Sequence, residues 1–96
     1  MRLGKFVKSP SERKRYKINY ADWLDVSETV SNVVYSTSPD NVLVADGSEI
    51  AGDGKSVTFY VSGGTLDTTY DLFVLMTTSG GQVKEDFIIF VVEEQG

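Results

Sequence analysis

The sequence predicts an all-β fold, an antiparallel β-sandwich of about six to seven short strands. Apolar and polar residues alternate with a period of two along most of the chain, and no long segment has the 3.6-residue period of a helix. Turn-forming glycine, proline, aspartate and serine residues separate the alternating segments. A chain of 96 residues, 41% hydrophobic and 24% charged, is long enough for one core. Two packed sheets in one sandwich domain fit these observations.

The sandwich is predicted to begin after a basic N-terminal arm. We assign residues 1–14 to the arm and residues 15–96 to the domain. One turn at Ala21–Asp25 is expected to place Trp23 and Leu24 in the core. Six segments are predicted as strands: Arg15–Tyr20, Val30–Thr37, Asn41–Ala45, Ser56–Ser62, Thr69–Thr78 and Gln82–Glu93.

The last two strands are predicted to form a hairpin. A tight turn at Gly80-Gly81 is favoured because glycine reaches positive φ at low cost. This turn sets Tyr70 opposite Val91 and Leu72 opposite Ile89, on the face that fills the core.

The other face of the hairpin is also apolar, although the outer face of an antiparallel sheet is normally polar. Its large apolar residues are Phe73, Leu75, Ile88, Phe90 and Val92. We interpret these residues as a partner-binding surface, because a patch of roughly a few hundred Å² is large for a monomer. The alternative is that a loop or the N-terminal segment of the same chain covers this face.

Charge is distributed unevenly along the chain. Residues 1–17 carry seven basic side chains and one acidic one, whereas residues 18–96 carry two basic and thirteen acidic side chains. An acidic body argues against a face that binds duplex DNA. The basic residues Lys8, Arg13, Lys14 and Arg15 are therefore candidate contacts to an anionic protein partner or to a neighbouring copy. The alternative is a solvated, disordered N-terminus.

Several kinds of chemistry are excluded by composition. The chain has no cysteine and no histidine, so it has no disulfide, thiolate nucleophile, zinc finger or Ser-His dyad. An acidic loop with Asp46-Gly47 and Asp53-Gly54 could offer oxygen ligands to Ca²⁺, but its spacing does not match an EF-hand. A pair of hydrolytic carboxylates is a remote alternative.

No stretch approaches the length of a membrane span. We predict no enzyme activity, cofactor, metal, nucleic acid, membrane or small-molecule substrate.

The segment before the long strand at residue 70 indicates the type of sandwich. Gly64–Thr69 precedes Tyr70, in the arrangement of the tyrosine corner of immunoglobulin-like domains. The alternative is an ordinary core tyrosine. The cysteine pair of antibody domains is absent.

Two blocks of the sequence, spread over residues 8–93, resemble a known family. The first contains Lys8-Ser9-Pro10-Ser11-Glu12, Tyr16-Lys17-Ile18-Asn19-Tyr20, Asp22-Trp23-Leu24 and Glu28-Thr29-Val30. The second contains residues 56–65, Thr69-Tyr70 and Thr77-Thr78-Ser79-Gly80-Gly81. In order and spacing these blocks are similar to the small immunoglobulin-like virion proteins of tailed bacteriophages, the fibre–tail adaptor family.

This resemblance implies a structural virion protein, an immunoglobulin-like adaptor that joins the tail or connector to fibres. The expected partners are other phage structural proteins and neighbouring copies of the chain. The expected location is the virion, most simply its tail, after assembly in the host bacterial cytoplasm. Two alternatives remain: a head or tail decoration module, and a carbohydrate- or receptor-binding β-sandwich.

Overall fold

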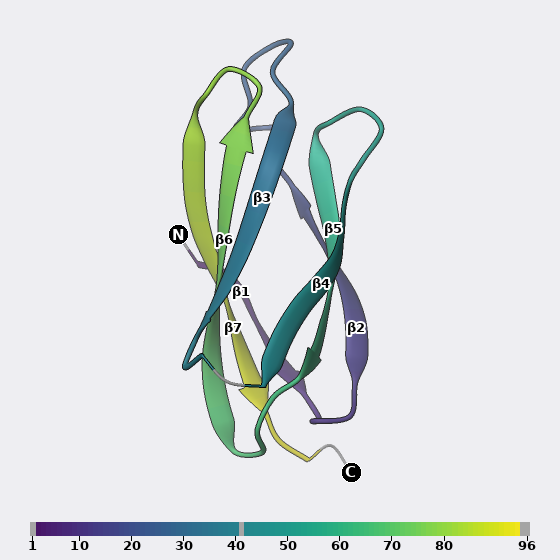
Figure 1. Cartoon of the computed structure of the whole chain (residues 1–96), viewed down its shortest axis with the longest axis vertical. Helices are drawn as coiled ribbons and strands as arrows, with labels where there is room; N and C mark the ends of the chain where they lie inside the picture. The colour runs from purple at the N-terminus through teal and green to yellow at the C-terminus, as the bar shows by residue number, and fades with distance from the viewer. Residues whose placement is uncertain (1, 41, 95–96) are drawn as a thin grey trace.

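The computed structural model describes residues 2–40 and 42–94, and these residues form two β-sheets packed face to face (Figure 1). Within these ranges the chain contains strands and turns but no helix. The strands are β1 (Arg2–Lys8), β2 (Arg13–Asn19), β3 (Val30–Ser38), β4 (Leu43–Ile50), β5 (Ser56–Gly63), β6 (Thr68–Thr78) and β7 (Val83–Val92). The predicted all-β sandwich is confirmed.

The order of the strands is that of an immunoglobulin-like fold. One sheet has the order β1-β7-β6-β3 and the other has the order β2-β5-β4. The third, sixth and seventh strands of immunoglobulin constant domains share a sheet in the same way. The first strand differs from the constant-domain arrangement, because β1 pairs in parallel with β7. All other neighbours are antiparallel.

The core lies between the two sheets and follows the alternation of the strands. Val57, Phe59 and Val61 of β5 are fully buried, as the sequence predicts. From the facing sheet, β6 contributes Tyr70, Leu72, Val74 and Met76 and β7 contributes Ile88, Phe90 and Val92. A fully buried side chain of this size stabilises the fold by about 1.5–3 kcal/mol relative to leaving it exposed.

The tyrosine corner is present. The backbone N–H of Thr65 donates a hydrogen bond of 2.8 Å to the phenol oxygen of Tyr70. The ring of Tyr70 is fully buried. This bond fixes the loop that brings the chain from β5 in one sheet to β6 in the other.

The β6–β7 hairpin is displaced by one residue from the predicted register. The backbone N–H of Thr78 donates to the carbonyl of Gln82, which leaves a three-residue loop with Gly81 at φ 87° in place of a two-residue turn. Leu72 therefore lies opposite Ile88, not Ile89. A shift of one residue exchanges the two faces of a strand.

The predicted partner surface is corrected by this shift. Ile88, Phe90 and Val92 were expected to face outward, but their side chains are at most 3% exposed and belong to the core. Phe73 and Leu75 do face outward, where Phe73 lies opposite Phe87 and Leu75 lies opposite Glu85, and Ile89 and Val91 of β7 share this face.

The N-terminal segment lies within the sandwich of its own chain. β1 pairs with β7 over nearly its whole length, and β2 already begins at Arg13. No boundary near residue 14 separates an arm from the two sheets, where the sequence predicts an arm over residues 1–14. The ring of Phe6 packs on Tyr16 and Phe90, with ring centroids 4.9 and 5.8 Å apart.

Two smaller expectations have different outcomes. Leu24 is buried, as predicted, but Trp23 is 38% exposed, so its placement in the core is wrong. A strand was predicted at Asn41–Ala45, and its first residue, Asn41, lies outside the described residues. Met1 of the predicted arm and residues 95–96 of the predicted domain also lie outside them. The observed β4 starts at Leu43 and extends to Ile50.

Candidate partner-binding surface

The outer face of the four-stranded sheet carries a row of apolar side chains beside the charged residues Lys5, Asp71 and Glu85. Val34 of β3 lies beside Leu75 of β6, and both are exposed, by 51% and 36%. Phe73 of β6 lies beside Phe87 of β7, with ring centroids 6.1 Å apart. We call the following residues the outer apolar face: Val7, Val34, Phe73, Leu75, Phe87, Ile89 and Val91.

This face crosses all four strands of the sheet. Val7 of β1 lies beside Val91, and Val7 is 47% exposed. The N-terminal strand therefore extends the outer apolar face at the edge of the sheet and does not cover it. No described loop packs over Phe73 or Leu75 in a way that buries them. A contiguous apolar patch on a sheet is typical of a protein–protein contact surface.

The outer face of the three-stranded sheet has the opposite character. Its central strand presents Thr58, Tyr60 and Ser62, and its two edges add basic residues from β2 and acidic residues from β4. The guanidinium of Arg13 is 3.0 Å from the carboxylate of Asp46 and lies 4.1 Å above the centre of the Tyr60 ring. The sandwich thus has one broad face with many apolar side chains and one broad face with mainly polar and charged side chains.

Lys8 is not available to a partner in this structure. Its side chain is 2% exposed, and its ammonium donates hydrogen bonds to the carbonyls of Ser9 and Gly63. Burial lowers the pKa of Lys8, while Glu12 acts in the opposite direction. The expectation of a surface contact at Lys8 is therefore wrong for this fold. Instead, Lys8 fastens the end of β1 to the end of β5.

The other predicted basic contacts lie on β2 and are exposed. Lys14 and Arg15 have no ion-pair partner among the described residues, whereas the pair between Arg13 and Asp46 is half-exposed. Lys17, which the sequence analysis did not select, belongs to the same strand and is also exposed. Binding of a partner by Arg13, Lys14 and Arg15 stays a prediction.

A hydrogen-bonded cluster stabilises the end of the sandwich that carries the β6–β7 loop. The carboxylate of Glu28 accepts a 2.6 Å hydrogen bond from the Thr78 hydroxyl and further bonds from the Gln82 side chain and the Asp25 backbone. The Thr78 hydrogen bond contributes most to lowering the pKa of Glu28. A Cβ on Gly80 would lie 2.7 Å from this carboxylate, so a larger residue at position 80 would displace the Glu28 side chain from its hydrogen bonds. Glu28 is buried and is therefore a structural residue.

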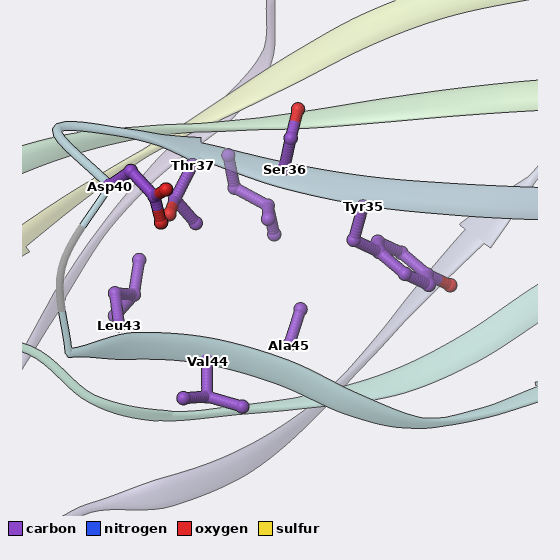
Figure 2. A pocket seen from close by; sticks show the side chains of 8 residues that line it. Tyr35, Ser36, Thr37, Asp40, Leu43, Val44 and Ala45 are labelled. Atoms are coloured by element: carbon purple, nitrogen blue, oxygen red, sulfur yellow. The ribbon is translucent and has the colours of Figure 1, made fainter.

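Two grooves lie at the open sides of the sandwich. One, of about 440 Å³, lies between β3 and β4 and is lined by Tyr35, Asp40, Leu43 and Ala45 among others (Figure 2). The other, of about 490 Å³, includes Leu3, Tyr20 and Trp23 and the ion pair between Lys84 and Asp86. In the described part of the chain, no group of three or more metal-ligating side chains gathers in either groove or elsewhere. No described helix is long and apolar enough to cross a membrane.

Comparison with known proteins adds to this geometry. The sequence profile of one family, described as podophage GP4 fiber-tail adaptor protein gp77, matches residues 8–91. The chain belongs to this family. A search of curated proteins found no match.

Membership of the fiber-tail adaptor family makes the chain a structural component of phage particles. The predicted resemblance is confirmed, since the matched segment covers nearly the whole sandwich. An adaptor must contact other phage structural proteins. Sequence reasoning placed Phe73 and Leu75 on the outer face of the sheet but missed Phe87, Ile89 and Val91 there. The glycine pair after Ser79 is compatible with a three-residue loop and was the signal for this register. Contact of these residues with a partner stays a prediction.

Proposed function

We propose that this fiber-tail adaptor joins the phage tail or connector to fibres, and that it does so through the outer apolar face of its four-stranded sheet. The observation that supports the proposal is the pair Phe73 and Phe87 on the outside of a sheet whose inner face already fills the core. Burying such side chains against another protein contributes roughly 1.5–3 kcal/mol each, before the costs of association.

The rigidity of the sheet supports the same proposal. Phe73 and Phe87 are held by the central β6–β7 ladder, and the tyrosine corner anchors the start of β6. An apolar group on a rigid strand loses little conformational entropy when a partner covers it. In this proposal the protein is part of the virion tail and is assembled in the host bacterial cytoplasm, and it performs no catalysis.

A complementation experiment tests the role of this face. A phage that lacks the gene is supplied with the variant Phe73→Lys/Phe87→Lys, and purified particles are assayed for the adaptor and for fibres. We expect the variant to fold, as judged by circular dichroism and thermal melting, but to be absent from particles. The matched control Thr58→Lys/Ser62→Lys adds the same charge to the outer face of the other sheet and is expected to be incorporated. A folded outer-face variant that reaches particles at the wild-type level would refute the proposal.

A receptor- or carbohydrate-binding role is the second candidate, and one observation favours it. Trp23 is exposed beside the groove that contains Lys84 and Asp86, and its ring lies 5.8 Å from the Lys84 ammonium. Aromatic faces next to charged groups are suited to small polar ligands. Trp23 is the single tryptophan of the chain, so its fluorescence reports directly on this groove. A saturable fluorescence change on adding host surface glycans, together with calorimetric binding that is lost in Trp23→Ala, would support this role, and no binding by either method would exclude it.

A further inference from the structure

The narrow sides of the sandwich are formed by two pairs of edge strands. At one side, β3 and β4 approach each other, and the Tyr35 hydroxyl lies 2.8 Å from the Ser48 hydroxyl. At the other side, β1 and β2 approach through the contact of Phe6 with Tyr16. We call residues 30–50 the β3–β4 side and residues 2–19 the β1–β2 side. In the described structure, neither side is covered by another segment of the chain.

The edge strands at the two narrow sides carry opposite charges, and Arg13 and Asp46 of these strands meet across Tyr60 on the outer face of the three-stranded sheet. The β1–β2 side has seven basic residues and one acidic residue, whereas the β3–β4 side has three acidic residues and no basic one. The exposed basic residues are Arg2, Lys5, Arg13, Lys14, Arg15 and Lys17, and the exposed acidic ones are Asp40, Asp46 and Glu49. Only the pair of Arg13 with Asp46 is neutralised within the described chain.

The directions of the edge strands are compatible with a repeated arrangement. β2 and β4 are both antiparallel to β5, so they run parallel to each other. β7 and β3 are both antiparallel to β6, so they run in the same direction. Because β1 is parallel to β7, β1 and β3 also run parallel to each other. A second copy in the same orientation therefore brings its β1–β2 side to the β3–β4 side of the first with parallel edges.

The β3 edge lacks the features that prevent strand addition. Edge strands are commonly protected from pairing by charged residues, proline or a bulge. β1 and β2 carry basic residues, and β4 carries Asp46 and Glu49 with a register shift between them. β3 spans nine residues without a charge or a proline, and its register shift is confined to its first residues, between Val30 and Asn32. Its outer backbone groups are available for a neighbouring chain.

We propose that copies of this chain associate head to tail, with the basic β1–β2 side of one copy against the acidic β3–β4 side of the next. Contact between two identical sides would set like charges against each other, so charge complementarity selects the heterologous arrangement. The groove between β3 and β4, with Asp40 at one end (Figure 2), receives a basic side chain of the neighbouring copy. This contact leaves the outer apolar face free, so it goes beyond the docking role proposed above.

Sedimentation of the purified full chain tests the proposal. We expect self-association that strengthens with protein concentration and weakens when salt is raised from low ionic strength to about 0.5 M NaCl. The variant Arg2→Glu/Lys14→Glu/Arg15→Glu/Lys17→Glu changes the net charge of the β1–β2 side from +6 to −2, and Asp40→Lys/Glu49→Lys changes that of the β3–β4 side from −3 to +1. Each variant alone is expected to associate at least about tenfold more weakly than the wild type.

Mixing the two variants gives the sharpest outcome. The changed β1–β2 side of one variant complements the changed β3–β4 side of the other variant. The two unchanged sides also complement each other. An equimolar mixture is therefore expected to recover association. The control Asp71→Lys/Glu85→Lys makes the same change of charge as Asp40→Lys/Glu49→Lys, but on the broad face of the four-stranded sheet. It should associate like the wild type. Asp71 is partly buried and the other substituted positions are exposed, and circular dichroism verifies that each variant folds. A chain that stays monomeric at low salt into the millimolar range, or a mixture that does not recover, overturns the proposal. Neither result bears on docking by the outer apolar face.

Discussion

The phenol oxygen of Tyr70 accepts a 2.8 Å hydrogen bond from the backbone N–H of Thr65, five residues before it. The bond closes the loop between the two sheets and sets the start of β6. Because β6 carries Phe73 on its outer side and Leu72 on its inner side, the tyrosine corner fixes which residues face the core and which face a partner.

The variant Tyr70→Phe tests this anchoring role. The substitution keeps the buried ring but removes the oxygen, and the loss of a partly buried hydrogen bond costs about 0.5–1.5 kcal/mol. We expect the free energy of unfolding to fall by about that amount in urea denaturation. Tyr60→Phe is the matched control, because the Tyr60 ring lies at the surface beneath Arg13, and its stability should change by less than about 0.5 kcal/mol.

Alanine substitutions at Phe90 and Phe87 test the register of the hairpin. Phe90 is fully buried, so Phe90→Ala should cost about 3–5 kcal/mol. Phe87 lies on the outer face and is partly exposed, so Phe87→Ala should cost about 1 kcal/mol. Chemical denaturation of both variants gives the comparison. The opposite order of the two losses would mean that the two-residue turn, and not the three-residue loop, is correct.

The alternation of residues was enough to predict the sandwich and six of its strands, but not the pairing of its last hairpin. Strand faces follow from the period of two in segments such as Ser56–Ser62. The register depends on whether Gly80-Gly81 forms the whole turn or Gly81 alone takes positive φ after a bend. Both conformations suit glycine, so local sequence could not decide between them.

Long-range contacts account for the other differences from the sequence prediction. The segment of β1 was predicted as part of a basic arm because basic residues gather near the N-terminus, whereas its partner β7 lies at the far end of the chain. Lys8 is buried only because the carbonyl of Gly63, 55 residues away, accepts its hydrogen bond. Glu28 similarly depends on Thr78, 50 residues away. None of these partners is visible from neighbouring residues in the sequence.

The stability of the fold is expected to decrease in acid through Glu28. Its pKa in the folded chain is lowered, so the stability that it contributes is present above its unfolded pKa and is lost as the pH falls through the folded pKa. Urea denaturation between about pH 6 and pH 3 should show this loss. In Glu28→Gln the side chain can still accept the Thr78 hydrogen bond but no longer titrates, so the loss should be smaller. If the free energy of unfolding falls with pH as steeply in this variant as in the wild type, other carboxylates cause the acid sensitivity.

Lys8 is expected to matter for stability and not for partner contact. Lys8→Ala removes the ammonium that donates to the carbonyl of Gly63, whereas the carbonyl of Ser9 still accepts from the backbone N–H of Glu12, and the loss should cost about 1–3 kcal/mol. Lys5→Ala, on the same strand but exposed, removes an equal charge and should leave stability unchanged within about 0.5 kcal/mol. Thermal melting of the pair gives the comparison, and equal melting temperatures would contradict the buried position of Lys8.

Deleting residues 2–7 tests whether β1 belongs to the domain or is a separable arm. The deletion removes the parallel ladder with β7 and the contacts of Phe6 with Tyr16 and Phe90. It also exposes β7, an apolar strand, as a new sheet edge, and such edges pair with other chains. We expect the melting temperature to fall by roughly 5–15 °C, which corresponds to about 1–2 kcal/mol in a domain of this size, together with aggregation that the full chain does not show. An unchanged melting temperature would restore the prediction of an independent arm, because a segment that contributes nothing to the stability of residues 15–96 is free to bind elsewhere.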